Sequence, residues 1–203
     1  ERFGVGRGHV REAIKRLDFY GILKTGPQSG SYVAGLGVTA AEGLFTNILN
    51  LEKGDFASLM DTRDILERHA ALLAAQKAED EEIEGIIEAH DEFREQVLQG
   101  KDGLEEDMLF HLRIADSSHS PVLRSLIRIM TPEILTLTRD LQVFGGERSR
   151  QALKEHEEIR NAIARRDAAG AEEGMKLHME GSRQRGNIHE EISMDNRSKR
   201  EER

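Results

Sequence analysis

The hydrophobic pattern at the start of the chain predicts one short helix followed by a β-hairpin. Apolar residues recur at helical spacing over residues 6–20, and basic residues occupy the other positions. The apolar stripe consists of Val10, Ala13, Ile14 and Leu17. Gly21 follows, where a glycine would end the helix. Two short extended runs, residues 22–24 and 31–33, flank a stretch of Gly, Pro and Ser that is typical of a hairpin turn.

After a glycine-containing linker at residues 35–38, the apolar spacing is helical throughout. We predict helices near residues 39–51, 55–77, 80–99, 103–117, 121–142, 148–166 and 168–187. From residue 190 charged residues replace the apolar pattern, so residues 190–203 are predicted to form a disordered tail. The predicted fold class is therefore all-α, with residues 1–34 as a small separate domain and residues 39–189 as the main domain.

Composition supports a helix-rich protein and excludes several kinds of chemistry. Of the 203 residues 37% are hydrophobic and only 4% are aromatic, which favours helices over a β-sandwich. The chain has no Cys, which excludes disulfides, thiolate zinc sites and cysteine nucleophiles. Because no apolar run is long enough to cross a bilayer and residues 1–8 lack a signal-peptide pattern, we predict a cytoplasmic protein without a membrane partner.

The net charge of −9 is distributed unevenly along the chain. Residues 1–24 contain six Lys or Arg and three Asp or Glu, so this segment carries +3 and the remainder carries −12. Such asymmetry suggests a small module that faces nucleic acid, joined to an acidic domain with another task.

A basic helix followed by a glycine-tipped hairpin is the arrangement with which a winged helix reads DNA. Arg7 lies near the start of the predicted helix, where its guanidinium can donate two hydrogen bonds to guanine. Gly6 and Gly8 would allow the backbone to approach DNA closely. The periodicity by itself also fits a basic amphipathic helix on the surface of any protein.

The specific residues of this segment resemble the signature of the GntR family of bacterial transcription regulators. The similar stretches are Phe3-Gly4-Val5-Gly6-Arg7-Gly8-His9-Val10-Arg11-Glu12-Ala13-Ile14, Tyr20-Gly21-Ile22-Leu23 and Pro27-Gln28-Ser29-Gly30-Ser31-Tyr32-Val33. The resemblance implies DNA contacts by Arg7 above all, and also by Gly6, Gly8, His9, Arg11 and Gly30. Relatives often carry small hydroxyl residues at positions 6, 8 and 9 and an arginine in the wing, so these departures leave the operator sequence open.

A helix-turn-helix also needs two supporting helices upstream of its recognition helix. Residue 1 directly precedes the predicted recognition helix. We therefore expect the winged-helix domain to be incomplete, which leaves open whether this chain alone binds operator DNA.

Four metal-capable residues share predicted helix faces with apolar residues. Asp107 and His111 are four residues apart and so lie on one face, while His156 and His178 each belong to the apolar stripe of a different helix. Neutral imidazoles and one carboxylate suit Zn²⁺, Ni²⁺ or Mn²⁺. A single His on an apolar face is more often a hydrogen-bonded core residue, so the hypothesis depends on convergence of all four. We interpret the remaining histidines outside the DNA-binding segment as surface or packing residues, namely His69, His90, His119 and His189.

The helical part resembles the FCD effector domain of FadR-type GntR regulators, an antiparallel helical bundle with a central cavity. The similar segments are Asp107-Met108-Leu109-Phe110-His111, Glu155-His156-Glu157-Glu158-Ile159 with Ala162-Ile163, and His178. The resemblance covers about residues 1–187 and fills all four ligand positions of the family. It implies a bound divalent transition metal, Zn²⁺ or alternatively Ni²⁺ or Mn²⁺.

Arg63 is a candidate for effector binding. It shares an apolar stripe with Leu59 and Leu66, and its spacing from Glu67 permits an i,i+4 ion pair within one helix. A guanidinium beside a metal could instead bind the carboxylate of a ligand with two hydrogen bonds. Similarity to the Arg-x-x-Leu-Glu motif of the family supports the second interpretation, and both hold if Glu67 orients Arg63.

The resemblance implies a homodimeric DNA-binding regulator, more commonly a repressor in this family, whose operator binding is controlled by a small organic acid at the metal and Arg63. The alternative is a metal-dependent hydrolytic enzyme in a helical bundle, in which the metal would activate water. No further motif for an acid, a base or a substrate pocket supports it, and we predict that the chain is not an enzyme. A third, weaker hypothesis is a helical scaffold with a purely structural metal.

Overall fold

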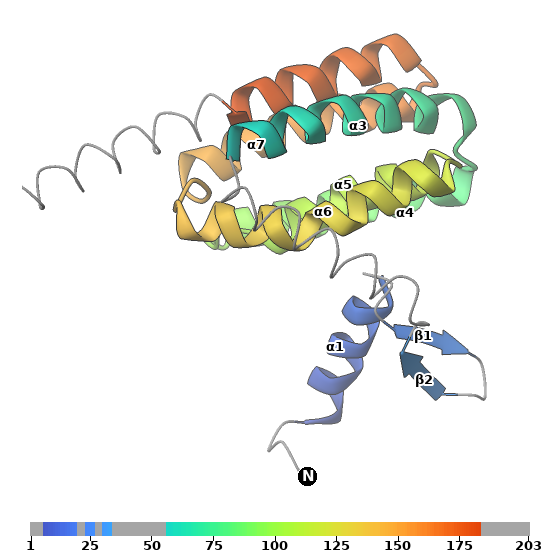
Figure 1. Ribbon diagram of the computed structural model, residues 1–203, viewed down its shortest axis with the longest axis vertical. Helices are drawn as coiled ribbons and strands as arrows, with labels where there is room; N and C mark the ends of the chain where they lie inside the picture. Colours follow the sequence, from blue (N-terminus) through green and yellow to red (C-terminus); the bar gives the residue numbers. More distant parts are fainter. Residues whose placement is uncertain (1–5, 20–22, 27–29, 34–55, 184–203) are drawn as a thin grey trace, which may run out of the picture. The chain divides into compact units, whose positions relative to one another are not determined.

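The computed structural model describes residues 6–19, 23–26, 30–33 and 56–183. The chain divides into two compact units, residues 1–53 and residues 54–203. Both are drawn in Figure 1. The predicted helix at 39–51, the linker at 35–38 and the tail at 190–203 lie outside the described residues, and so does the predicted boundary between the two domains.

The first unit contains the predicted helix and hairpin. Helix α1 (Arg7–Phe19) is followed by the antiparallel strands β1 (Leu23–Gly26) and β2 (Gly30–Val33). Gly30 has a φ of 75°, a left-handed conformation that glycine adopts without the steric penalty of a Cβ. The antiparallel register of the two strands pairs Gly26 with Gly30.

The described part of the second unit is helical. Its helices are α3 (Phe56–Lys77), α4 (Asp80–Leu98), α5 (Leu104–Ser117), α6 (Pro121–Asp140), α7 (Glu147–Ala164) and a last described helix over residues 168–183. The predicted bounds of α3 to α7 differ from the observed ones by at most two residues. The all-α fold class is confirmed.

Ion pairs between helices show that neighbouring helices run antiparallel. Arg139, near the end of α6, lies 2.8 Å from Glu105, near the start of α5. Arg183, at the end of the last described helix, lies 2.6 Å from Asp61, near the start of α3. Exposed pairs of this kind contribute little to stability. They report the direction of the helices, and that direction matches the predicted antiparallel bundle.

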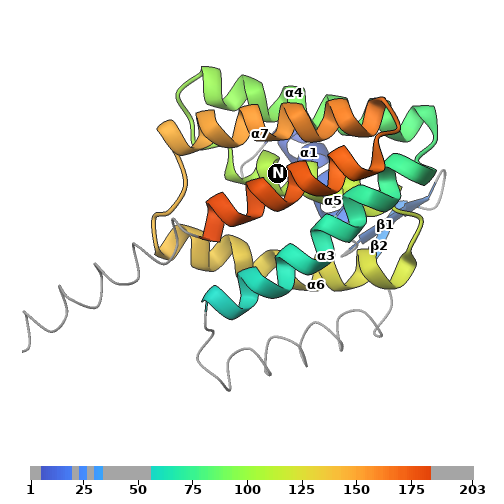
Figure 2. The same ribbon diagram turned by 90° about the horizontal axis from the view of Figure 1, so that it is seen from above.

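Helix α5 lies in the middle of the bundle, where it contacts α3, α4 and α6 (Figure 2). Nine of its 14 residues are buried. A helix that is buried on most of its sides must be surrounded by other elements, and polar groups on it are then shielded from water. Any Asp or His carried by α5 at an inward position is consequently shielded from water.

A glycine sets the start of this central helix. Gly103 precedes α5 with a φ of 71°, and a Cβ on it would lie 2.9 Å from the ring of Phe93. Only glycine satisfies both the left-handed backbone and this close approach. Acidic residues fill the first turn of α5, where they interact favourably with the positive end of the helix dipole.

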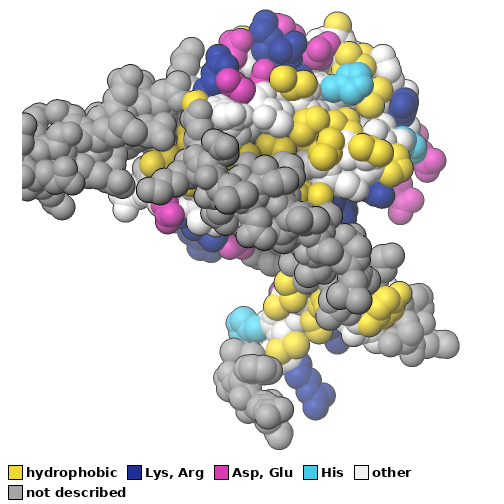
Figure 3. Space-filling view, in the orientation of Figure 1, with side chains coloured by type: hydrophobic (Ala, Val, Ile, Leu, Met, Phe, Trp, Pro, Cys, Tyr) yellow, Lys and Arg dark blue, Asp and Glu magenta, His cyan; other side chains and the backbone are white. Residues whose placement is uncertain are grey.

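The surface of the second unit carries charge of both signs. Figure 3 shows acidic and basic side chains interspersed on the visible face. None of the described helices combines the length and the hydropathy that a membrane span requires.

Candidate metal centre

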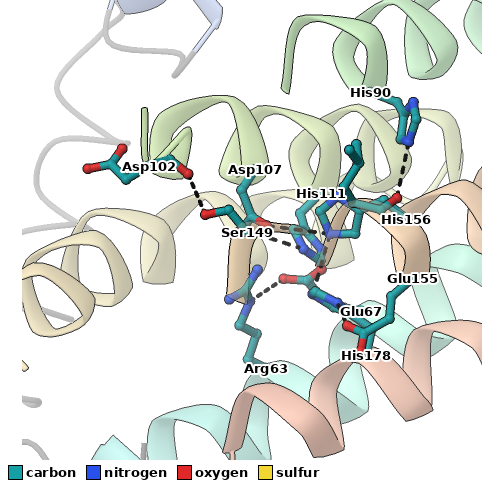
Figure 4. A network of polar contacts seen from close by, with 11 residues as sticks. Arg63, Glu67, His90, Asp102, Asp107, His111, Ser149, Glu155, His156 and His178 are labelled. Atoms are coloured by element: carbon teal, nitrogen blue, oxygen red, sulfur yellow. Dashed lines mark hydrogen bonds and ion pairs between the residues drawn. The ribbon is translucent and has the colours of Figure 1, made fainter. Parts of the chain in front are cut away.

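The four predicted ligands lie together inside the helical unit. Asp107 and His111 project from α5, His156 from α7 and His178 from the last described helix, and one donor atom of each lies within 4.8 Å of the others. Each of the four residues is at most 2% exposed. Figure 4 shows the side chains pointing toward one another. The convergence that the sequence hypothesis required is therefore present.

The separations between donor atoms fit a single shared ion. Nε2 of His156 lies 3.4 Å from Nε2 of His178 and 3.5 Å from Oδ1 of Asp107. Nε2 of His111 lies 3.9 Å from Oδ2 of Asp107. Zinc binds imidazole nitrogen at about 2.0–2.1 Å, which places the ligand atoms of a tetrahedral site roughly 3.4 Å apart. The donor set and its spacing thus suit a transition metal.

Two of the three imidazole rings have a carboxylate at Nδ1, the ring nitrogen that faces away from the cluster. Nδ1 of His178 lies 2.8 Å from Oε2 of Glu155, and Nδ1 of His111 contacts Oε2 of Glu67. A carboxylate at one ring nitrogen fixes the tautomer and directs the other nitrogen toward a metal. Sequence reasoning did not assign this role to either glutamate. The available signals were the position of Glu155 directly before His156 and the spacing of Glu67 from Arg63.

Aromatic packing holds the third ring. Phe110 stacks on His156 with ring centroids 4.2 Å apart and an interplanar angle of 20°, and Phe93 lies at a centroid distance of 5.3 Å. Nδ1 of His156 is buried and has no hydrogen-bond partner among the described residues. The orientation of His156 therefore depends on packing.

The electrostatics of the cluster favour the forms that bind a cation. Burial lowers the pKa of His156 well below its usual value, and the neighbouring His178 and His111 lower it further. Burial also lowers the pKa of His111 and of His178, against the opposing effects of Glu67 and Glu155. Neutral imidazole is the ligand form of His. Burial raises the pKa of Asp107 to about 6, and the charge of a bound cation would favour its ionised form.

Arg63 lies beside the cluster and forms the ion pair that its spacing allows. It is 5% exposed, and its Nε donates a hydrogen bond of 2.5 Å to Oε1 of Glu67. Nη2 of Arg63 is buried and has no hydrogen-bond partner among the described residues. Figure 4 shows the guanidinium near the cluster, with Glu67 between Arg63 and His111. A buried guanidinium with an unsatisfied donor can accept a further anionic partner.

The other histidines of this unit agree with their interpretation as surface or packing residues. His69 is exposed, and Nε2 of His119 lies 2.7 Å from Glu82 in a partly exposed pair. His90 is buried, and its Nε2 lies 3.3 Å from the carbonyl oxygen of Leu153. His189 lies outside the described residues.

The residues predicted to contact DNA lie on or beside α1 and β2. All six are exposed, namely Gly6, Arg7, Gly8, His9, Arg11 and Gly30. Val10 and Leu17 of the apolar stripe are 42% and 37% exposed. The DNA contacts themselves stay predictions.

Comparison with known proteins identifies the helical unit. The family model of the FCD domain matches residues 58–181, which is more than half of the chain. The HTH-type transcriptional regulator LutR of Bacillus subtilis (strain 168) is 32% identical over 183 residues, which cover 88% of this chain and 84% of LutR. The Uxu operon transcriptional regulator of Escherichia coli (strain K12) is 29% identical over 194 residues, which cover 91% of this chain and 74% of that protein.

Solved structures share the fold. Streptococcus agalactiae GntR superposes with a TM-score of 0.55 at 21% identity, covering 90% of this chain and 84% of that one. E. coli McbR/YncC gives a TM-score of 0.54 at 19% identity, covering 95% and 84%. The sequence relatives are transcriptional regulators, so this chain is a regulator and not an enzyme. The chain belongs to the GntR family of transcriptional regulators, of the FadR type with an FCD domain.

Proposed function

We propose that this GntR-family regulator binds operator DNA as a cytoplasmic homodimer and represses transcription under the control of a small organic acid. The acid binds at a divalent metal ion inside the FCD domain. The observation that carries the proposal is the buried convergence of four metal-capable side chains beside Arg63.

Different residues of the site bind the metal ion and the effector. Asp107, His111, His156 and His178 hold the ion, for which Zn²⁺ is the first choice and Ni²⁺ or Mn²⁺ the alternatives. The ion supplies a Lewis-acidic position for a carboxylate or hydroxyl oxygen of the effector. Arg63 donates to the effector carboxylate from the Nη end of its guanidinium, since Glu67 already occupies Nε. A hydroxy acid or a sugar acid would satisfy both contacts.

The link from effector to DNA is a change in the arrangement of the dimer. Helix-turn-helix proteins read two half-sites as dimers, with one recognition helix in each major groove. Arg7 and Arg11 of α1 would contact the DNA, with Gly6, Gly8 and His9 close to its backbone and Gly30 in the wing. The effector changes operator affinity only if it binds one arrangement of the two recognition helices more tightly than the other.

A thermal-shift screen of small organic acids tests the proposal. A ligand that binds only the folded state at 100 times its Kd stabilises the protein by about 2.7 kcal/mol. We expect at least one hydroxy acid or sugar acid to raise the Tm of zinc-loaded protein but not of metal-free protein, and to lose this effect in Arg63→Ala. Arg63→Ala should weaken binding of the acid more than binding of the metal.

The same screen separates the proposal from a purely structural metal. If zinc raises the Tm but no acid adds to it, the metal is structural and the sensing role is wrong. If an acid raises the Tm equally with and without zinc, the effector does not bind at the metal.

A further inference from the structure

Two pairs of residues with the same spacing face each other across α3 and α5. Arg63 and Glu67 are one helical turn apart on α3, and Asp107 and His111 are one turn apart on α5. Residues with this spacing lie on one face of a helix. Since α3 and α5 are in contact, the two faces meet, and Glu67 stands between the arginine and the imidazole.

Each oxygen of the Glu67 carboxylate has a different partner. Oε1 accepts a hydrogen bond of 2.5 Å from Nε of Arg63, and Oε2 contacts Nδ1 of His111. Glu67 is 2% exposed, so water does not screen either contact. The guanidinium of Arg63 carries a positive charge, so the buried carboxylate of Glu67 is paired with a cation at one oxygen and with an imidazole at the other.

We propose that Glu67 is a positioning residue that couples Arg63 to His111, so that a change at Arg63 alters the affinity of the metal site. This inference rests on the proposed function, because it takes His111 as a metal ligand. Arg63 is not itself among the metal-capable side chains of the cluster. Glu67 links it to the cluster, because it contacts both Arg63 and His111.

The physical basis is competition for one buried carboxylate. A carboxylate behind a ligating imidazole orients the ring and increases the basicity of the nitrogen that faces the metal, and loss of such a partner typically costs 10- to 100-fold in metal affinity. Arg63 draws on the same negative charge through Oε1. An effector carboxylate that binds Arg63 would weaken the hydrogen bond between Arg63 and Oε1 of Glu67. The negative charge at Oε2 would then increase, and with it the interaction of Glu67 with His111. Coupling between the two binding events must then be reciprocal.

Glu155 supplies a matched control. Its Oε2 lies 2.8 Å from Nδ1 of His178, so it supports a different ring of the same cluster. Its Oε1 accepts a hydrogen bond of 2.9 Å from Gln151. Glu67→Gln and Glu155→Gln therefore both remove a carboxylate at the Nδ1 of a metal-facing imidazole, and Glu67 is the one that accepts the hydrogen bond from Nε of Arg63.

The experiment is a pair of double-mutant cycles with zinc alone as the probe. Zinc affinity of the full-length protein is measured by competition with a chromophoric chelator for wild type, Arg63→Met, Glu67→Gln, Glu155→Gln and the two double variants that contain Arg63→Met. Methionine keeps most of the side-chain volume of arginine while removing its charge. Contacting residues give non-additive effects, whereas residues without shared partners give additive ones.

We expect Arg63→Met to change the zinc Kd by a factor that differs at least fivefold between the wild-type and the Glu67→Gln backgrounds. The factor should be the same within about twofold in the wild-type and Glu155→Gln backgrounds. Equal factors in all three backgrounds would overturn the inference while leaving the metal site intact. If wild-type protein binds no zinc, the proposed function itself fails.

Loss of folding is monitored separately, since Glu67→Gln leaves the buried charge of Arg63 without its counterion. Far-UV circular dichroism and the Tm are recorded for every variant. If Glu67→Gln does not fold, Glu67→Asp takes its place in the cycle. Its carboxylate is one methylene shorter, so at least one of the contacts with Arg63 and His111 lengthens, and a difference between the factors in the same direction is expected.

Discussion

The three imidazoles of the cluster are held in position by two different means. His111 and His178 each have a glutamate at Nδ1, whereas His156 is stacked on Phe110. In each case the ring presents Nε2 to the cluster. The inward direction of these rings could be predicted from apolar stripes, because burial alone determines which face of a helix turns inward. The supporting contacts could not, because they join residues on different helices.

At this scale we predict that His111→Ala or His178→Ala removes the metal. Each substitution deletes one of the four donors, and the three donors that remain bind a divalent ion much more weakly than four. Elemental analysis of purified protein should show about one transition metal per chain in the wild type and nearly none in either variant. His69→Ala, which changes an exposed His on α3, is the control and should retain the metal. A wild-type protein purified under native conditions without metal would contradict the assignment.

At the scale of elements, α5 places two of the four metal-capable residues, Asp107 and His111, in the middle of the bundle. The bounds of α3 to α7 could be predicted closely from the helical periodicity of apolar residues. Periodicity does not reveal which helices become neighbours. The central place of α5 is a result of packing.

Gly103 offers a test of how strictly the start of α5 is determined. Gly103→Ala forces a left-handed backbone, which costs roughly 1–2 kcal/mol. It also introduces overlap with the fully buried ring of Phe93, and overpacking typically costs about 1–3 kcal/mol more. We expect the free energy of unfolding to fall by about 2–5 kcal/mol in denaturant titrations, and zinc affinity to fall too, because Phe93 also packs on His156.

Gly100→Ala is the matched control for this substitution. Gly100 has a φ of 76°, but nothing lies within 4 Å of the position of its Cβ. The expected loss is roughly 1–2 kcal/mol from the backbone alone, with unchanged zinc affinity. Equal losses for both glycines would mean that contact with Phe93 does not position α5.

At the scale of the whole molecule, the chain joins a small basic unit to an acidic helical domain that encloses a polar cluster. Burying three imidazoles and a carboxylate opposes folding unless a partner compensates them. A metal ion would provide that compensation in the folded state only.

We therefore predict that removing the metal destabilises the helical domain. Chelation by EDTA should lower the Tm by about 5–10 °C, the shift that corresponds to a loss of about 2.7 kcal/mol in a domain of this size. Differential scanning calorimetry measures the shift, and adding zinc back should restore the original Tm. In His111→Ala the same treatment should leave the Tm unchanged, and a shift of equal size there would show that EDTA acts elsewhere.

The basic unit leads to a prediction about DNA. In the full-length protein, Arg7→Ala should weaken binding to operator DNA selected by the wild type from random duplexes by roughly 5- to 150-fold for each recognition helix, because a bidentate contact to guanine typically contributes about 1–3 kcal/mol of discrimination. Gel-shift titration measures the affinity. Lys154→Ala removes the same charge from an exposed position on α7 and should have no effect. Unchanged operator binding by folded Arg7→Ala would refute the assignment of the recognition helix.

The amino-acid sequence by itself determined the helices, their inward faces, the hairpin and the four metal-capable residues, because these depend on local periodicity and on residue chemistry. It also carried the resemblance to the GntR family. Only the tertiary structure decided that α5 lies at the centre, that Phe110 covers His156 and that one carboxylate of Glu67 meets both Arg63 and His111. The physical reason is that contacts between helices depend on how whole helices pack and rotate against one another, and no spacing along a single helix specifies that.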